Sequence, residues 1–145
     1  MEQQLKEMKA LSFLIGKWNT KGEIKEDGNM PATKIIGTDR YEWVLNGCFI
    51  LHKADVKMGD EKIEVIELIG EFDNISRTYK MRSFDNQGNF VTMVAHLDEI
   101  STLHILGDKM RSKLSIIDSN NISVHWEKSE DNKNWKLWME LSFSK

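Results

Sequence analysis

A histidine stands in the middle of a segment whose residues alternate between apolar and polar, Cys48–Met58 (CFILHKADVKM). Such alternation is typical of a β-strand with one buried face. His52 shares the more apolar face with Cys48, Ile50, Ala54, Val56 and Met58. We therefore expect His52 to point inward, where an imidazole can act as an acid, a base, a ligand or a pH sensor. The alternative is a core histidine that is simply paired with its neighbours.

A second candidate is Glu67, in the segment IEVIELIG. It shares one face with Ile63, Val65 and Ile69. If this face is internal, the carboxylate borders an apolar cavity, where it can orient a polar ligand group or move a proton. The opposite face, with Ile66, Leu68 and Phe72, is nearly as apolar. A solvated glutamate therefore stays an open alternative.

Aromatic residues next to polar ones mark two further segments. In the last segment, Trp138 and Glu140 share one face, and the other face carries Trp135, Leu137, Met139, Leu141 and Phe143. Hydrophobicity alone places the face with Trp135 and Phe143 in the core, and the face with Trp138 and Glu140 in solvent. A ligand cavity combines aromatic surface with a few polar groups, which favours Trp138 and Glu140 as a pocket wall. Tyr41 and Trp43, in the earlier segment 33–44, leave the same two alternatives: a wall of a ligand pocket or ordinary core packing.

Other catalytic and metal-binding patterns are weak. His96 and His104 flank a predicted turn, but spacing places no third ligand beside them, and a zinc site needs at least three protein ligands. Cys48 follows an Asn-Gly turn and would be a nucleophile only with a histidine partner; its neighbours favour a small buried hydrophobe. The sequence lacks a G-x-S-x-G elbow and any P-loop or dinucleotide glycine pattern. We expect no metal, no cofactor and no assigned catalytic residue.

The elements that must position these residues are mostly strands. Leu5, Met8, Leu11 and Ile15 recur at helical spacing, which predicts one N-terminal helix ended by Gly16. After Gly16 the period changes to two, and a turn signal recurs about every 8–12 residues, as in an all-β sandwich or barrel. The predicted strands cover residues 17–24, 33–44, 48–58, 61–72, 77–84, 90–97, 101–106, 109–117, 121–128 and 135–145.

A closed barrel is the favoured arrangement of these strands. The one proline, Pro31, lies outside them, so every strand can hydrogen-bond on both sides. Tight turns between consecutive strands suit an up-and-down barrel, whose closure removes exposed edges. We predict a single domain over residues 1–145: an antiparallel barrel of about ten strands with a short helix at one end. Trp18, just after the helix, is expected to seal that end.

Composition limits the partners and the compartment. The chain has 145 residues, 40% of them hydrophobic and 30% charged, with a net charge of −3. It shows no basic stripe of the kind that nucleic-acid binders carry, and no apolar run long enough for a membrane helix or a signal core. Its one cysteine cannot form an internal disulfide, which favours a reducing compartment. We expect a cytoplasmic protein that binds neither nucleic acid nor membranes.

Several motifs together resemble a known family. They are Gly16-Lys17-Trp18, the hairpin Tyr41–Phe49 (YEWVLNGCF), the turn at residues 84–89 (FDNQGN) and the final Trp135, Trp138, Met139 and Glu140. In this combination the chain resembles a bacterial family of unknown function with a lipocalin-like, calycin-type barrel. The resemblance implies an internal cavity. A more distant similarity is to nitrobindin-like haem barrels, but this chain has no histidine after His125 to hold a haem.

Three functions follow as alternatives. The first is a binding protein for a small apolar or amphipathic molecule held in the barrel. Its expected ligand-binding residues are Tyr41, Trp43, His52, Glu67, Trp138 and Glu140. The second is an enzyme that uses His52 and a cavity carboxylate as an acid–base pair. The third is a filled barrel that acts as an interaction module or a homodimer.

Overall fold

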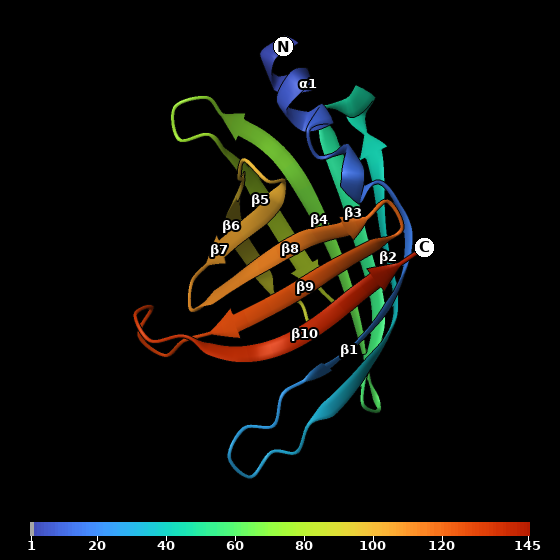
Figure 1. The fold of residues 1–145 in the computed structure, drawn as a ribbon, viewed down its shortest axis with the longest axis vertical. Coiled ribbons are helices and arrows are strands. Elements are labelled where there is room, and N and C mark those ends of the chain that lie inside the picture. The colour runs from blue at the N-terminus through green and yellow to red at the C-terminus, as the bar shows by residue number, and fades with distance from the viewer. Residues whose placement is uncertain (1) are drawn as a thin grey trace.

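The computed structural model describes residues 2–145 and contains one closed antiparallel β-barrel of ten strands (Figure 1). Each strand pairs with its neighbour in sequence, and β1 pairs with β10 to close the barrel. The strands are β1 Gly16–Ile24, β2 Thr33–Val44, β3 Phe49–Met58, β4 Glu61–Asp73, β5 Thr78–Asp85, β6 Phe90–Leu97, β7 Thr102–Gly107, β8 Met110–Asp118, β9 Asn121–Lys128 and β10 Lys136–Ser144. The predicted fold class is confirmed, and every predicted strand end lies within one residue of the observed end.

The N-terminal helix is shorter than expected. Helix α1 spans Glu2–Lys9, and a separate 3₁₀ turn, η1, spans Ser12–Leu14. The prediction of one helix running to Gly16 is therefore wrong. Backbone bonds from Leu11 N to Met8 O and from Leu14 N to Leu11 O tighten the chain to three residues per turn. This spacing buries Met8, Leu11 and Leu14 completely, so packing on the barrel decides where the helix ends.

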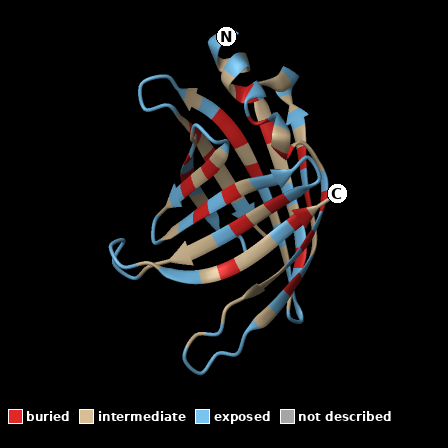
Figure 2. Cartoon of the chain, viewed as in Figure 1, coloured by how far each residue is buried: buried red, intermediate tan, exposed pale blue. Residues whose placement is uncertain are grey.

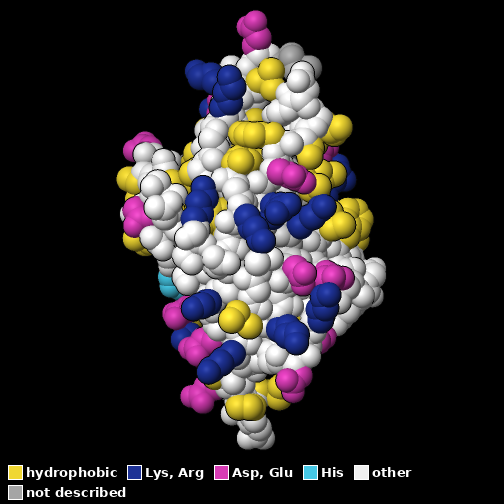
Figure 3. All heavy atoms as spheres, turned by 90° about the vertical axis from the view of Figure 1, so that its right-hand side faces the viewer, with side chains coloured by type: hydrophobic (Ala, Val, Ile, Leu, Met, Phe, Trp, Pro, Cys, Tyr) yellow, Lys and Arg dark blue, Asp and Glu magenta, His cyan; other side chains and the backbone are white. Residues whose placement is uncertain are grey.

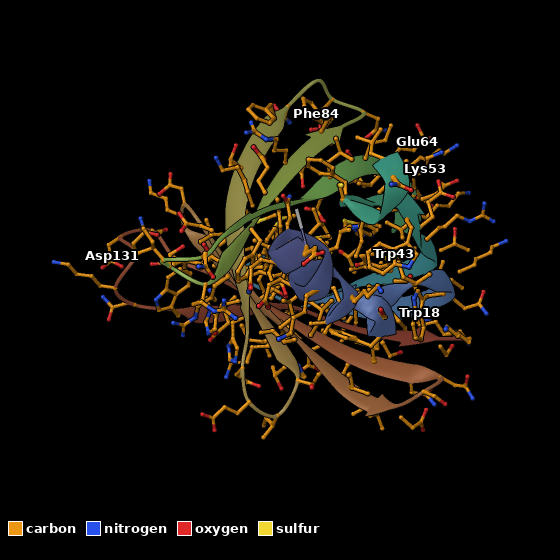
Figure 4. The ribbon with its side chains drawn as sticks, turned by 90° about the horizontal axis from the view of Figure 1, so that it is seen from above. Trp18, Trp43, Lys53, Glu64, Phe84 and Asp131 are labelled. Carbon is orange, nitrogen blue, oxygen red and sulfur yellow. The ribbon has the colours of Figure 1, made fainter. Side chains whose placement is uncertain are left out.

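These three side chains and Trp18 cover one end of the barrel. Seen from above, α1 lies across the middle of the ring of strands (Figure 4). The Trp18 side chain is 1% exposed, and its Nε1–H donates a hydrogen bond of 2.7 Å to the carbonyl of Leu14. Lys145 Nζ lies 4.6 Å from the centre of the indole ring and donates a hydrogen bond to the Ile15 carbonyl. The indole on β1 thus contacts both the helical segment, through Leu14, and the C-terminal residue, Lys145.

Alternation along the strands separates the interior from the surface, so buried and exposed residues follow each other on most strands (Figure 2). Exposed apolar residues also occur on the outside, including a stacked pair, Phe84 and Phe90, whose ring centres are 4.8 Å apart. Lysine and arginine side chains alternate with acidic ones over the face in Figure 3. No helix within residues 2–145 has the length and hydrophobicity needed to span a bilayer.

Two strand glycines let β1 and β2 bend closely against their neighbours. A Cβ atom at Gly22 would lie 2.0 Å from the Glu140 carbonyl oxygen on β10. A Cβ atom at Gly37 would lie 2.2 Å from the Asp55 carbonyl oxygen on β3. No real side chain fits at such distances, so glycine permits the tight curvature of this part of the barrel.

We predict that Trp18→Ala lowers the free energy of unfolding by about 3–5 kcal/mol, because it removes a fully buried indole and its hydrogen bond. Urea unfolding followed by circular dichroism measures this loss. Trp43→Ala is the control, because Trp43 is 36% exposed and should cost clearly less. Equal losses in the two variants would show that the indole of Trp18 does not hold this end together.

Candidate ligand cavity

The barrel encloses a cavity of about 250 Å³. All ten strands and Leu14 of η1 contribute to its lining, which is predominantly aliphatic, aromatic and methionine side chains. A barrel of eight strands is just wide enough for side chains to fill it or for one small ligand. Ten strands make a wider ring, which leaves space that the inward side chains do not occupy.

One wall of this cavity carries a polar network centred on His52. The ring nitrogen Nε2 lies 2.6 Å from Asp39 Oδ1 on β2, and Nδ1 lies 3.0 Å from Glu67 Oε1 on β4. Two hydroxyls extend the network: Thr20 donates to Asp39 Oδ2, and Ser83 donates to Glu67 Oε2. The register explains the arrangement, because Tyr41 and Glu67 are the direct cross-strand partners of His52 and Thr20 lies on the strand beside Asp39.

The hydrogen bonds fix how many protons the network holds. Each ring nitrogen faces a carboxylate oxygen, so a proton must lie in both contacts. Either His52 is an imidazolium between two carboxylates, or a neutral imidazole accepts from one protonated carboxyl group. The net charge of His52, Asp39 and Glu67 is −1 in both arrangements. Asp39 and Glu67 are only 5% exposed, so this charge is held inside the barrel.

Burial and hydrogen bonding act on His52 in opposite directions. Burial by itself lowers the pKa of the imidazole, since it disfavours the charged form. The hydrogen bonds to Asp39 and Glu67, together with their negative charges, outweigh burial and raise the pKa from 6.5 to about 9. His52 is therefore a cation at neutral pH, which makes it a proton donor rather than a base.

Tyr41 covers one face of the imidazole. The two rings are stacked, with centres 4.0 Å apart and planes inclined by 7°. Burial, followed by the charges of Asp39 and Glu67, raises the pKa of the Tyr41 phenol well above 10. The phenol is therefore neutral and keeps its O–H. Tyr41 as a whole is only 4% exposed.

The two ends of the cavity differ in exposure. Toward α1 the lining is buried, as at Leu14, Ile69 and Phe143. Toward the opposite end most of the lining is half-buried: Ala54, Met58, Ile63, Val65, Ser83, Val91, Met110, Trp126 and Trp138. Ile35, Val56 and Met139 form a small buried cluster among them. This end lies toward the loops that join β1–β2, β3–β4, β5–β6, β7–β8 and β9–β10, and we call it the mouth.

The sequence-predicted site residues divide into two groups. Tyr41, His52, Glu67 and Trp138 line the cavity. The expected inward orientations of His52 and Glu67 are confirmed, because each lies with its own apolar face in the lining. A change of register between Leu137 and Met139 lets both Trp138 and Met139 line it, contrary to simple alternation.

The other two predicted residues, Trp43 and Glu140, lie outside this lining, and the expected inward position is wrong for Glu140. Trp43 lies on the inward face of β2. However, it is near the end of the strand, beyond Tyr41, and is 36% exposed. Glu140 follows the irregular register of β10 and faces outward. There it forms an ion pair of 3.1 Å with Lys25 and lies 3.8 Å from His125.

Four residues of the site escaped the sequence analysis: Thr20, Asp39, Ser83 and Trp126. Two of them could have been found from the alternation of the strands, because residues two apart on a strand share a face. Asp39 stands two residues before Tyr41 on β2, and Thr20 stands two residues after Trp18 on β1. An acid on the same face as an inward tyrosine is itself an inward acid. Only the register between strands shows that Asp39 contacts His52 and that Ser83 contacts Glu67.

The remaining histidine pair lies on the outer surface. His96 and His104 are cross-strand partners whose rings stack 4.8 Å apart. His104 Nε2 lies 2.8 Å from Asp98 Oδ2. Within residues 2–145, no group of three or more histidine, cysteine or acidic side chains is arranged to hold a metal ion.

Comparison with known protein families identifies the family of this chain. The sequence profile of DUF1579, described as a protein of unknown function, matches residues 3–145. The chain belongs to the DUF1579 family. Comparison with the curated proteins gives no match.

We predict that His52 stays doubly protonated at pH 8, because its folded pKa is about 9. Nitrogen-15 NMR of the histidine side chains across pH 5–10 measures this directly. A folded pKa above the unfolded value of 6.5 stabilises the protein fully below pH 6.5, and this contribution disappears as pH rises through 9. Its size is on the order of 3 kcal/mol. Titration of His52 near 6.5 would contradict the network described above.

Proposed function

We propose that this protein binds a small apolar or amphipathic molecule inside its barrel. The observation that carries the proposal is a cavity inside the barrel with mostly apolar walls and one fixed polar network. Ligand sites combine an apolar lining with a small number of polar groups that set the orientation of the ligand. We further propose that the barrel is lipocalin-like and that the protein acts in the bacterial cytoplasm, where its single cysteine stays reduced.

The cavity limits the size of the ligand. An apolar protein cavity of about 150 Å³ holds one benzene molecule. On that scale, a cavity of about 250 Å³ suits a ligand of roughly ten non-hydrogen atoms. A single or fused aromatic ring with a short polar substituent has this size. A long fatty acyl chain does not fit within it unless the half-buried side chains at the mouth move.

The contact between His52 and Glu67 gives some support to the enzymatic alternative. Their separation of 3.0 Å is within the reach that proton transfer between them requires. However, both ring nitrogens are directed at protein carboxylates, and a pKa of about 9 removes the imidazole as a base at neutral pH. The network is therefore better suited to orient a ligand than to exchange protons with a substrate.

A variant that fills the cavity tests the binding function. Ala54 lines the cavity next to His52 on β3, and its small side chain leaves space there. We predict that indole, a neutral molecule of suitable size, binds the wild-type protein and that Ala54→Leu weakens this binding at least fivefold. Two-dimensional ¹H–¹⁵N NMR titration measures the affinity and locates the perturbed residues.

Lys53→Leu is the matched control, because Lys53 neighbours Ala54 but points away from the barrel (Figure 4). It adds a leucine to the same strand without reducing the cavity, so its affinity for indole should equal that of the wild type. Thermal unfolding of both variants separates a loss of binding from a loss of folding. Equal affinity in the wild-type and Ala54→Leu proteins would place the indole site outside the cavity.

A further inference from the structure

The ionisable groups that line the cavity have an uneven balance of charge. Asp39 and Glu67 are acidic and His52 is basic, while none of the described lining residues is a lysine or an arginine. As derived above, the three groups carry a net charge of −1 whichever of them hold the two shared protons. The rest of the lining is uncharged. A ligand inside the barrel therefore meets a wall with a single negative charge.

The hydrogen-bonding capacity of the network also favours a ligand group that donates hydrogen bonds. The Thr20 and Ser83 hydroxyls already donate to the carboxylates, and both protons between His52 and the carboxylates are used. A carboxylate accepts about four hydrogen bonds, and Asp39 and Glu67 each accept two here. The network thus has spare acceptors and no spare donor.

Tyr41 lies beside the network and lines the cavity. Its ring stacks on the His52 imidazole, with the two ring centres 4.0 Å apart. Both carboxylates act electrostatically on this phenol, so it lies near the same charges. The oxygen of a neutral phenol can accept a hydrogen bond from a cation that the carboxylates attract.

The structure also leaves space for such a group. Ala54 is the next inward residue after His52 on β3 and is the cross-strand partner of Asp39. It is half-buried although it faces inward, so the network borders open cavity on the side toward the mouth. A polar end placed there would leave the apolar body of the ligand among the methionine, valine and tryptophan side chains of the remaining wall.

We propose that the ligand is a small amphipathic amine whose protonated amino group lies beside Asp39 and Glu67. This inference rests on the proposed function and specifies its ligand class. The ammonium donates to the spare acceptors of the carboxylates and compensates their charge, while the apolar body fills the rest of the cavity. A carboxylate ligand of the same shape meets a wall of net negative charge.

Three probes that share one apolar body test this proposal: 2-phenylethylamine, 2-phenylethanol and phenylacetate. Each has about ten non-hydrogen atoms, the size estimated for the cavity. We expect the wild-type protein at pH 7 to bind the amine at least tenfold more tightly than phenylacetate, with the alcohol between them. ¹H–¹⁵N NMR titration gives the three dissociation constants and shows whether cavity-lining residues respond.

The outcomes distinguish the two proposals. If the amine binds most tightly at the cavity, both proposals are supported. If all three probes bind there equally, or phenylacetate binds most tightly, the cavity function stands and the amine inference is wrong. If none of them perturbs the cavity-lining residues, both proposals fail for ligands of this size.

Two glutamate variants then assign the selectivity to the network. Glu67→Gln removes one negative charge beside His52, and we expect it to abolish the preference for the amine over the alcohol. Glu140→Gln removes an equivalent charge from the outer face of β10 and should keep the wild-type preference. An unchanged preference in folded Glu67→Gln would overturn the assignment, and the wild-type ranking decides the proposal if that variant does not fold.

Discussion

Pairing of β1 with β10 is the constraint on which the rest of this structure depends. It joins the first strand to the last, so every strand has two neighbours and the sheet has no free edge. Once the sheet is closed, each strand has one face inside and one face outside. The period of two then assigns every side chain to one of these environments, and a cavity forms wherever the inward side chains are too small to meet.

Closure also explains why the polar network has its particular composition. Two carboxylates inside a barrel are costly unless each is paired and hydrogen-bonded. His52 bridges them, Thr20 and Ser83 satisfy their remaining oxygens, and Tyr41 stacks on the imidazole. Five strands, β1 to β5, contribute to this one cluster. Loss of any one of the five hydrogen-bonded side chains would therefore leave a buried charge or a buried acceptor without its partner.

The two ends of the barrel are built for different roles. The helical segment and Trp18 fill one end with fully buried apolar side chains. At the mouth, the two indoles of Trp126 and Trp138 meet edge to face, with centres 6.4 Å apart, and stay half-buried. Nearby, Asp27 in the β1–β2 loop forms ion pairs with Lys128 and Lys136, which joins that loop to the ends of β9 and β10.

Local sequence pattern was sufficient to predict the strands and most of their faces. Alternation identified the ten segments, and the turn signals between them located their ends, because both depend on local chemistry. It also placed His52 on an inward face, since its neighbours at every second position are apolar. Tertiary structure decided what local pattern does not encode. Packing ended α1 at Lys9, an irregular register turned Trp138 inward, and exposure at the strand end left Trp43 outside the cavity lining. Above all, the register between strands brought Asp39 and Glu67 to the two nitrogens of one histidine, because partners that are distant in sequence are set by pairing across the sheet.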